Sequence, residues 1–219
     1  MFSFKKYPQN IWTNLAISML QKEDLNGKNI IDAPCGNGHI AFHVAEVFKN
    51  NKVYAFDIDK KQLNSVYLRT GLPNLIVEER DIFTLKLESN NNIWLFINSL
   101  YCLPDTDKLM ENCGSYMDVI IAVFPRIDSL NFITFEKLNP QFDNPSKMSI
   151  NDTVLFFAKY NFTQVERIDC TGVAFHKWNN FFNKIRLPNK LRNFIFTTCD
   201  YLIPSLSKEY VIIKFKRNA

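Results

Sequence analysis

The sequence contains few of the residues that mark cross-linked or flexible chains. Its 219 residues include only 6 Gly, 9 Pro and 5 Cys. The cysteines are odd in number, widely spread and form no Cys-x-x-Cys pair, which argues against a zinc ribbon and a disulfide framework. Glycine and proline are scattered, so no segment has the composition of a linker, and we find no internal repeat.

Long apolar runs and a strong charge of one sign are also lacking. No stretch reaches the roughly 18 to 20 apolar residues of a membrane span, and no signal-peptide-like run follows the N-terminus. We therefore expect a cytoplasmic protein with no membrane partner. The net charge of +4 is compatible with an anionic substrate but is far weaker than the footprint of a dedicated nucleic-acid binder.

Apolar residues, by contrast, are plentiful. They make up 47% of the chain and include 20 Phe, which is enough for a sizeable core. The length suits one large α/β domain or two small ones. We expect one domain over residues 1–219, with residues 1–25 as an N-terminal helical cap.

The apolar pattern alternates between strands and helices. A helical stripe covers Pro8 to Lys22. Strands are predicted at 29–33, 52–57, 75–79, 93–97, 117–123, 165–168 and 210–215, and helices near 40–48, 60–70 and 149–160. Such alternation predicts an α/β fold with a doubly wound, mostly parallel sheet, and the two late strands predict an antiparallel edge. Residues 171–207 fit no strand and are expected to form one or two helices over the carboxyl ends of the strands.

One segment carries a specific chemical signal. A buried strand ends at Asp32, a tight turn containing Gly36 and Gly38 follows, and a helix begins. Glycines let a ligand approach backbone N–H groups at the carboxyl end of a strand, so this unit indicates a nucleoside-bearing ligand. The Asp-x-x-x-Gly-x-Gly spacing differs from the Gly-x-Gly-x-x-Gly of dinucleotide enzymes and from a P-loop.

With this turn, the sequence resembles the class I, Rossmann-like, S-adenosylmethionine (SAM)-dependent methyltransferases. Residues 32–38 match the first motif of that family, an acid followed by a glycine-rich turn, with Pro34 standing where the first glycine is usual. The resemblance implies a seven-stranded sheet of that fold, SAM as cofactor and S-adenosylhomocysteine (SAH) as product. It assigns a cofactor-binding role to Asp32, Ala33, Pro34, Gly36 and Gly38.

Three further features of the family follow in order. Asp57 ends the second strand about 20 residues past the turn, which is the place of a ribose-binding acid. Asp81 after the third strand matches the acid that contacts the adenine amine, and residues 98–105 match the segment facing the methyl donor. The resemblance thus adds Asp57, Ile58, Asp81, Ile82, Asn98 and Ser99 to the cofactor site. It covers residues 29–105, and beyond Cys113 only the strand pattern matches.

The three acids also have structural interpretations. Asp32 can cap the following helix, Asp57 can be a solvated turn acid beside Asp59, and Asp81 can cap a loop. We favour the cofactor roles. His39 and His43 have the spacing of two metal ligands, but no third ligand is evident, so we predict no metal.

The sequence offers three candidate catalytic residues. His176 is the best general base, because His titrates near neutral pH and residues 171–207 form the variable acceptor-site segment of this fold. Asp105 is a second candidate proton acceptor, and Tyr101 belongs to either the acceptor side or the core. Cys35 and Cys102 are interpreted as small buried thiols. Basic residues in the same variable segment form either a solvated face or an anion-binding group: Lys177, Lys184, Arg186, Lys190 and Arg192.

These features predict methyl transfer to an O or N of a small molecule, such as a sugar or a phosphorylated or otherwise anionic metabolite. A nucleic-acid methyltransferase is the alternative enzyme, disfavoured because the chain lacks a separate RNA-binding domain and an Asn/Asp-Pro-Pro-Tyr motif. A non-catalytic SAM-binding module is the alternative of another class. A dehydrogenase is disfavoured by the missing third glycine. The oligomeric state is not predicted.

Overall fold

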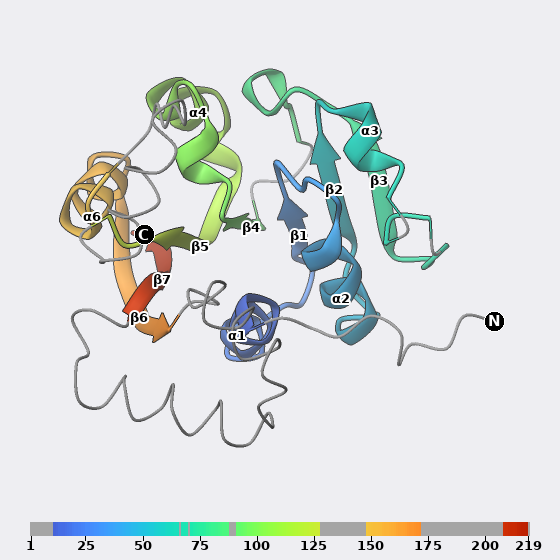
Figure 1. Ribbon diagram of the computed structural model, residues 1–219, viewed down its shortest axis with the longest axis horizontal. Coiled ribbons are helices and arrows are strands. Elements are labelled where there is room, and N and C mark those ends of the chain that lie inside the picture. The colour runs from blue at the N-terminus through green and yellow to red at the C-terminus, as the bar shows by residue number, and fades with distance from the viewer. Residues whose placement is uncertain are drawn as a thin grey trace, which may run out of the picture.

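A computed structural model describes residues 11–65, 67–69, 71–87, 91–127, 148–171 and 208–218. Its strands form one seven-stranded sheet, shown in Figure 1. They are β1 (Asn29–Asp32), β2 (Val53–Asp57), β3 (Leu75–Glu79), β4 (Asn92–Ile97), β5 (Met117–Pro125), β6 (Phe162–Thr171) and β7 (Lys208–Arg217). The helices are α1 (Ile11–Leu20), α2 (His39–Val47), α3 (Lys60–Leu63), α4 (Thr106–Cys113) and α6 (Ile150–Lys159), with short 3₁₀ turns η2 (Ile82–Thr84), η3 (Leu100–Cys102) and η4 (Gly114–Tyr116).

The strand order is β3-β2-β1-β4-β5-β7-β6. Strands β1 to β5 run parallel, and β7 is inserted antiparallel to both β5 and β6. This arrangement confirms the predicted α/β fold with antiparallel pairing at one end of the sheet. The order reverses between β1 and β4, and in such sheets the crevice at the carboxyl ends of the reversing strands is where ligands bind.

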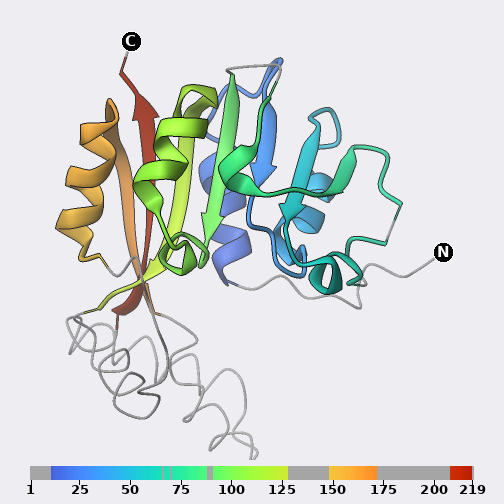
Figure 2. The ribbon, with the colours of Figure 1, turned by 90° about the horizontal axis from the view of Figure 1, so that it is seen from above.

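Helices cover both faces of the sheet (Figure 2). On one face, α4 and α6 bury Leu109 and Phe157 against Trp94 and Phe96 of β4. On the other face, α1 and α2 pack against strand residues such as Leu95. Because both faces are covered, the central strands carry consecutive apolar residues rather than an alternating pattern, as Ile93 to Ile97 of β4 illustrate.

The predicted helix over 60–70 is wrong beyond Leu63. Asn64 Nδ2 donates to the carbonyl of Lys60 at 3.0 Å, and the Ser65 hydroxyl donates to the carbonyl of Asn37. Side chains that bond to the backbone in this way compete with helix continuation. The short helix and the glycine turn are therefore joined through Ser65.

Helix α4 was not predicted, because its two turns bury only Leu109, Met110 and Cys113. Its N-cap is Asp105, whose Oδ1 accepts a hydrogen bond from the backbone N–H of Lys108 at 2.9 Å. Within the described residues, no helix is long and apolar enough to cross a membrane. The predicted cap contains α1, whereas residues 172–207 lie outside the described part of the chain.

A cluster of ion pairs joins the end of α1 to the antiparallel strands. Lys214 on β7 lies 2.9 Å from a carboxylate oxygen of Glu23 and 3.0 Å from one of Glu166 on β6. Lys216 lies 2.7 Å from the other oxygen of Glu23. The side chains of Lys214 and Glu23 are only 6% and 4% exposed. Each buried charge therefore needs the opposite charges beside it to offset its lost hydration.

Glu23→Gln is therefore expected to destabilise the protein at neutral pH by about 2 kcal/mol. This loss is smaller than the usual cost of breaking a buried ion pair, because Lys214 still pairs with Glu166 in the variant. Burial alone would raise the pKa of Glu23, but hydrogen bonds from Lys216 and Lys214 lower it below the ordinary 4.5. This stabilisation is present above about pH 4.5 and is lost as the pH falls through the lower pKa of the folded state.

Denaturant unfolding from neutral to acid pH measures both effects, and the variant should lose less stability on acidification than the parent. Asp107→Asn is the matched control, since Asp107 pairs with Lys159 at the surface and both side chains are more than half exposed. It should change stability by less than about 1 kcal/mol. Equal losses in the two variants would contradict the importance of the buried cluster.

Candidate functional site

Two buried carboxylates fasten the turn that follows β1. Asp57 ends β2 and is 8% exposed. Its Oδ2 accepts the N–H of Gly36 at 2.7 Å, and its Oδ1 accepts the N–H of Asp59 at 2.9 Å. Asp32 ends β1 and accepts the N–H of Ala41 in the first turn of α2 at 3.1 Å. Both acids thus fix the backbone between the sheet and the two helices that follow.

The turn also depends on backbone conformations that favour glycine. Gly36 and Gly38 have φ angles of 52° and 71°, in the left-handed region. Gly38 is the N-cap of α2, so the helix begins directly after the turn. Pro34, the departure from the family motif, precedes these two glycines and leaves their conformations intact.

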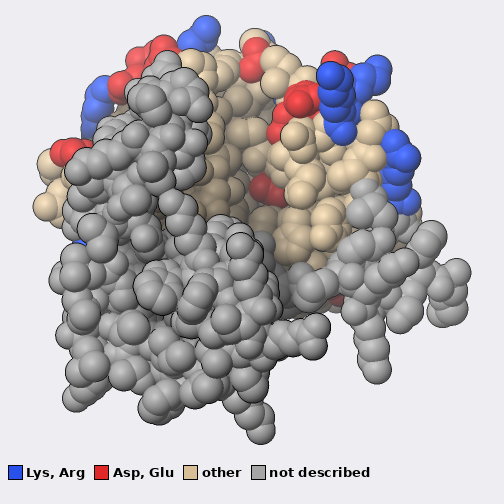
Figure 3. All heavy atoms as spheres, in the orientation of Figure 1, with Lys and Arg blue, Asp and Glu red and all other residues tan. Residues whose placement is uncertain are grey.

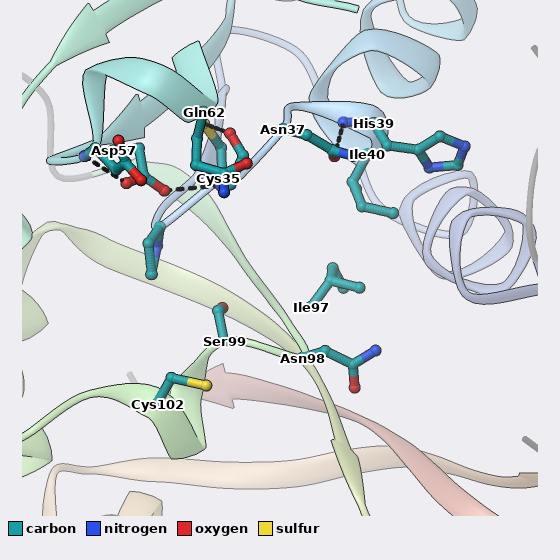
Figure 4. Close-up of a pocket in the computed structure, with 13 residues that line it drawn as sticks. Cys35, Asn37, His39, Ile40, Asp57, Gln62, Ile97, Asn98, Ser99 and Cys102 are labelled. Carbon is teal, nitrogen blue, oxygen red and sulfur yellow. Dashed lines mark hydrogen bonds between the residues drawn. The ribbon is translucent and has the colours of Figure 1, made fainter. Parts of the chain in front are cut away.

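A pocket of about 620 Å³ lies beside this turn, within the usual size range of ligand sites. Figure 4 shows its lining, which comes from the carboxyl ends of β1, β2 and β4 and the segments that follow them. The lining residues are Pro34, Cys35, Gly36, Asn37, His39, Ile40, Asp57, Asp59, Gln62, Ile97, Asn98, Ser99 and Cys102. The pocket thus occupies the crevice where the strand order reverses.

Five residues predicted to bind the cofactor line this pocket: Pro34, Gly36, Asp57, Asn98 and Ser99. Asp32, Ala33 and Gly38 belong to the same strand–turn–helix unit but are buried beneath the lining. Sequence reasoning assigned no role to Asn37 or Gln62, which also line the pocket. Asn37 was detectable as part of the turn, whereas Gln62 depends on how α3 is placed.

The remaining predicted cofactor residues lie outside the lining. Ile58 follows Asp57 and is 69% exposed. Asp81 is the N-cap of η2, where its Oδ1 accepts the N–H of Phe83 at 2.9 Å. Ile82 is buried in the core on the face covered by α4 and α6. Asp81 therefore caps η2, which is the structural role that the sequence offered as its alternative.

Burial controls the ionisation of several groups around the pocket. Burial, together with the nearby charge of Asp57, raises the pKa of Asp32 to about 7. The hydrogen bond from the Ala41 N–H acts in the opposite direction and lowers this pKa. Burial likewise raises the pKa of the Cys35 and Cys102 thiols, so both stay protonated at neutral pH. Cys102 is exposed and lines the pocket, which corrects its interpretation as a buried thiol.

Two polar side-chain atoms of the lining have no hydrogen-bond partner, although both are buried. They are Oδ1 of Asn98 and Oγ of Ser99, directly after β4. Asn98 also has a φ of 56°, which is uncommon for a residue other than glycine. Buried polar atoms without a partner are uncommon in folded proteins, which marks the segment after β4 as a candidate functional segment.

The candidate catalytic residues lie outside this lining or outside the described residues. Asp105 is exposed and caps α4. Tyr101 is half-buried against the core, and burial raises the pKa of its phenol, so the hydroxyl keeps its proton at neutral pH and is no general base. His176 and the basic cluster of Lys177, Lys184, Arg186, Lys190 and Arg192 fall outside the described residues.

The two histidines of α2 face other partners. Nδ1 of His39 lies 3.3 Å from the Thr13 hydroxyl, and Nδ1 of His43 lies 2.9 Å from a carboxylate oxygen of Glu46. Their rings pack edge to face with centroids 4.7 Å apart. In the part of the chain that the structure describes, no group of three or more His, Cys, Asp or Glu side chains is placed to hold a metal ion.

Comparison with known proteins identifies the family. A family model described as a methyltransferase domain matches residues 24–167, which is most of the chain. The chain belongs to this methyltransferase family. This result confirms the resemblance to class I, SAM-dependent methyltransferases, the enzyme class and the cofactor predicted from the sequence. A search of curated protein sequences gives no match.

Solved structures show the same fold at low sequence identity. Coclaurine N-methyltransferase bound to N-methylheliamine and SAH has a TM-score of 0.65 and 15% identity, covering 96% of this chain and 76% of that one. Magnesium protoporphyrin IX methyltransferase from Synechocystis PCC 6803, with bound SAH, has a TM-score of 0.63 and 14% identity, covering 94% and 82%. A SAM-dependent methyltransferase from Aquifex aeolicus has a TM-score of 0.61 and 12% identity, covering 94% and 89%.

Proposed function

We propose that this protein transfers a methyl group from SAM to an O or N of a small molecule. The observation that carries the proposal is the pocket at the reversal of strand order, where Asp57 fastens the glycine turn on one side and Asn98 and Ser99 line the other. Support for a small acceptor comes from solved structures of the same fold, whose names include small-molecule N-methyltransferases.

Each part of the predicted cofactor site has a distinct task in this proposal. Asp57 binds the ribose hydroxyls, because each of its oxygens accepts one backbone N–H and retains a further lone pair. The turn from Asp32 to Gly38 contacts the methionine part, and Asn98 and Ser99 lie at the methyl-donor end. Asp81, Ile82 and Ile58 flank the adenine in the family pattern.

SAM supplies an activated methyl group on a sulfonium, and the protein mainly supplies proximity and orientation. Where the acceptor needs to lose a proton, His176 and Asp105 remain the predicted proton acceptors, and Tyr101 remains a predicted residue of the acceptor side. The anionic character of the acceptor and the cytoplasmic location also remain predictions.

Calorimetric titration with SAH and, in parallel, with NAD tests the cofactor assignment. Binding of SAH with no heat from NAD is expected, and the reverse result would overturn the proposal. Release of SAH from SAM in the presence of a small-molecule panel then separates an enzyme from a module that only binds the cofactor. Turnover with nucleic acid alone would favour the alternative substrate class.

A further inference from the structure

A buried carboxylate lies beneath the wall of the pocket. Asp32 is 2% exposed, and one of its oxygens accepts the backbone N–H of Ala41 at 3.1 Å. With so little exposed surface, this carboxylate acts on a ligand through its charge. The charge reaches the pocket wall: after burial, which is the largest cause, the charges of Asp32 and Asp57 raise the pKa of the Cys35 thiol, which lines the pocket.

Among the described residues, the groups around Asp32 supply no cation. Its neighbours on the adjacent strands are Ala55 of β2 and Leu95 of β4, which are apolar and buried. The titratable groups whose interaction reaches it are the carboxylate of Asp57 and the thiol of Cys35. Ionisation of Asp32 is therefore unfavourable, because burial removes its hydration and a second negative charge repels it.

Helix α2 and the wider pocket do not add a positive partner in the part of the chain that the structure describes. Nδ1 of His39 lies 3.3 Å from a threonine hydroxyl of α1, and Nδ1 of His43 lies 2.9 Å from Glu46. In Figure 4 the ring of His39 points away from Asp57. The described lining adds the carboxylate of Asp59 but neither Lys nor Arg. Figure 3 shows the described Lys and Arg side chains at the outer margin of this face and carboxylate atoms in its central hollow.

The two ligands of the proposed reaction differ by one charge. SAM carries a sulfonium, whereas the same sulfur in SAH is a neutral thioether, and the adenosine and amino-acid groups are common to both. A negative charge beneath the pocket therefore stabilises SAM more than SAH, and a neutral carboxyl does not. The ratio of the two affinities isolates this effect, because the contacts that the ligands share cancel.

The charge of Asp32 changes near neutral pH. Burial raises its pKa from the ordinary 3.8 to about 7, opposed by the hydrogen bond from Ala41 and assisted by the charge of Asp57. The carboxyl is therefore mostly neutral below this pH and mostly ionised above it.

We propose that Asp32 distinguishes SAM from SAH, and that its ionisation couples the exchange of the two ligands to pH. The inference rests on the proposed methyl transfer and names a regulation of its cofactor site. Ionised Asp32 favours the cationic ligand, and by linkage this ligand favours the ionised carboxylate by the same factor. Loss of the positive charge in methyl transfer lets Asp32 take up a proton from solvent. SAH is then held less tightly, relative to SAM, as the pH rises.

The first test is calorimetric titration of the full-length protein with SAM and with SAH at pH 5.5 and pH 7.5, without an acceptor. The ratio of SAM affinity to SAH affinity should rise by about fivefold from the lower to the higher pH, as for a charge interaction that changes a proton affinity about tenfold. A ratio that is constant within about 1.5-fold would overturn the inference. Failure to bind either ligand would instead overturn the proposed function, and with it this inference.

Asp32→Asn tests the residue itself. The amide keeps an oxygen for the N–H of Ala41 but does not ionise, so the affinity ratio should stay constant with pH within about 1.5-fold. Titration of the amino groups of the ligands persists in the variant and is thereby subtracted. Thermal unfolding checks that the variant folds. If the folded variant kept the pH dependence of the parent, Asp32 would not be the discriminating group.

Asp59→Asn is the matched control. Asp59 also lines the pocket, but it is exposed, so water screens its charge. The variant should keep the pH dependence of the affinity ratio. Equal effects of Asp32→Asn and Asp59→Asn would assign the discrimination to the total negative charge of the pocket and would contradict the proposal.

A measurement on the unaltered protein complements the variants. Binding heats in two buffers of different ionisation enthalpy give the number of protons released on binding. Near pH 6.5, SAM should release up to about half a proton more than SAH, because only SAM favours the ionised form of Asp32. Equal release with the two ligands would refute the coupling.

Discussion

Asp57→Ala is expected to weaken the binding of SAH by about 100-fold, since the lost carboxylate bonds to ribose and backbone are each worth about 1.5–3 kcal/mol. The carboxylate has two functions in one place. It accepts the N–H groups of Gly36 and Asp59, which holds the glycine turn beside α3. It also offers its remaining lone pairs to the ribose hydroxyls, as proposed above. The variant therefore loses the contact to ribose and also the two hydrogen bonds that hold the loop around it.

Asp59→Ala provides the matched control. Asp59 also lines the pocket, but its side chain is exposed and caps the four-residue α3 by accepting the N–H of Lys61. Its loss should reduce SAH affinity by less than about fivefold, as for an exposed cap. Calorimetry at neutral pH measures both variants, and melting curves report any loss of folded protein. If Asp57→Ala bound SAH as tightly as the parent, the ribose assignment would fail.

Gly38→Ala should have the largest effect on stability, a loss of about 3–4 kcal/mol. The φ of 71° costs an L-residue about 1–2 kcal/mol. An added Cβ would also lie 2.8 Å from Cδ1 of Leu68 and closer still to its Cδ2 and Cγ. Leu68 is buried, so it has little room to move, and overpacking of this kind costs about 1–3 kcal/mol.

Gly36→Ala separates the cost of a positive φ from the cost of the contact with Leu68. Gly36 has a φ of 52°, but an added Cβ there would meet nothing within 4 Å. The variant should therefore lose only about 1–2 kcal/mol. Because Gly36 lines the pocket, we expect its Cβ to affect SAH binding more than folding.

Leu68→Ala in the Gly38→Ala background is the complementary test. Compared with Leu68→Ala alone, the double variant should lose less stability than the two single losses added together, because the smaller side chain removes the clash. Urea unfolding at neutral pH gives each free energy of unfolding. Equal losses in the two glycine variants would show that contact with Leu68 contributes nothing.

The sequence alone determined the fold class and the centre of the site. The apolar runs of the central strands indicated a sheet covered on both faces, and the spacing from Asp32 to Gly38 indicated the turn. Both signals are local, because a strand that is buried on both faces and a turn that needs positive φ restrict the residues at those positions directly. Asp57 was predicted for the same reason, since it ends a buried strand.

Tertiary structure decided what local signals left open. The predicted helix over 60–70 stops at Leu63, where Ser65 bonds across to Asn37. Asp81 and Asp105 both became helix caps, and only their surroundings distinguish a cap from a ligand contact. Hydrogen-bond satisfaction depends on neighbours distant in the sequence. For this reason only the folded chain revealed that Asn98 and Ser99 carry unpaired atoms, and that the charges of Lys214 and Glu23 compensate one another away from water.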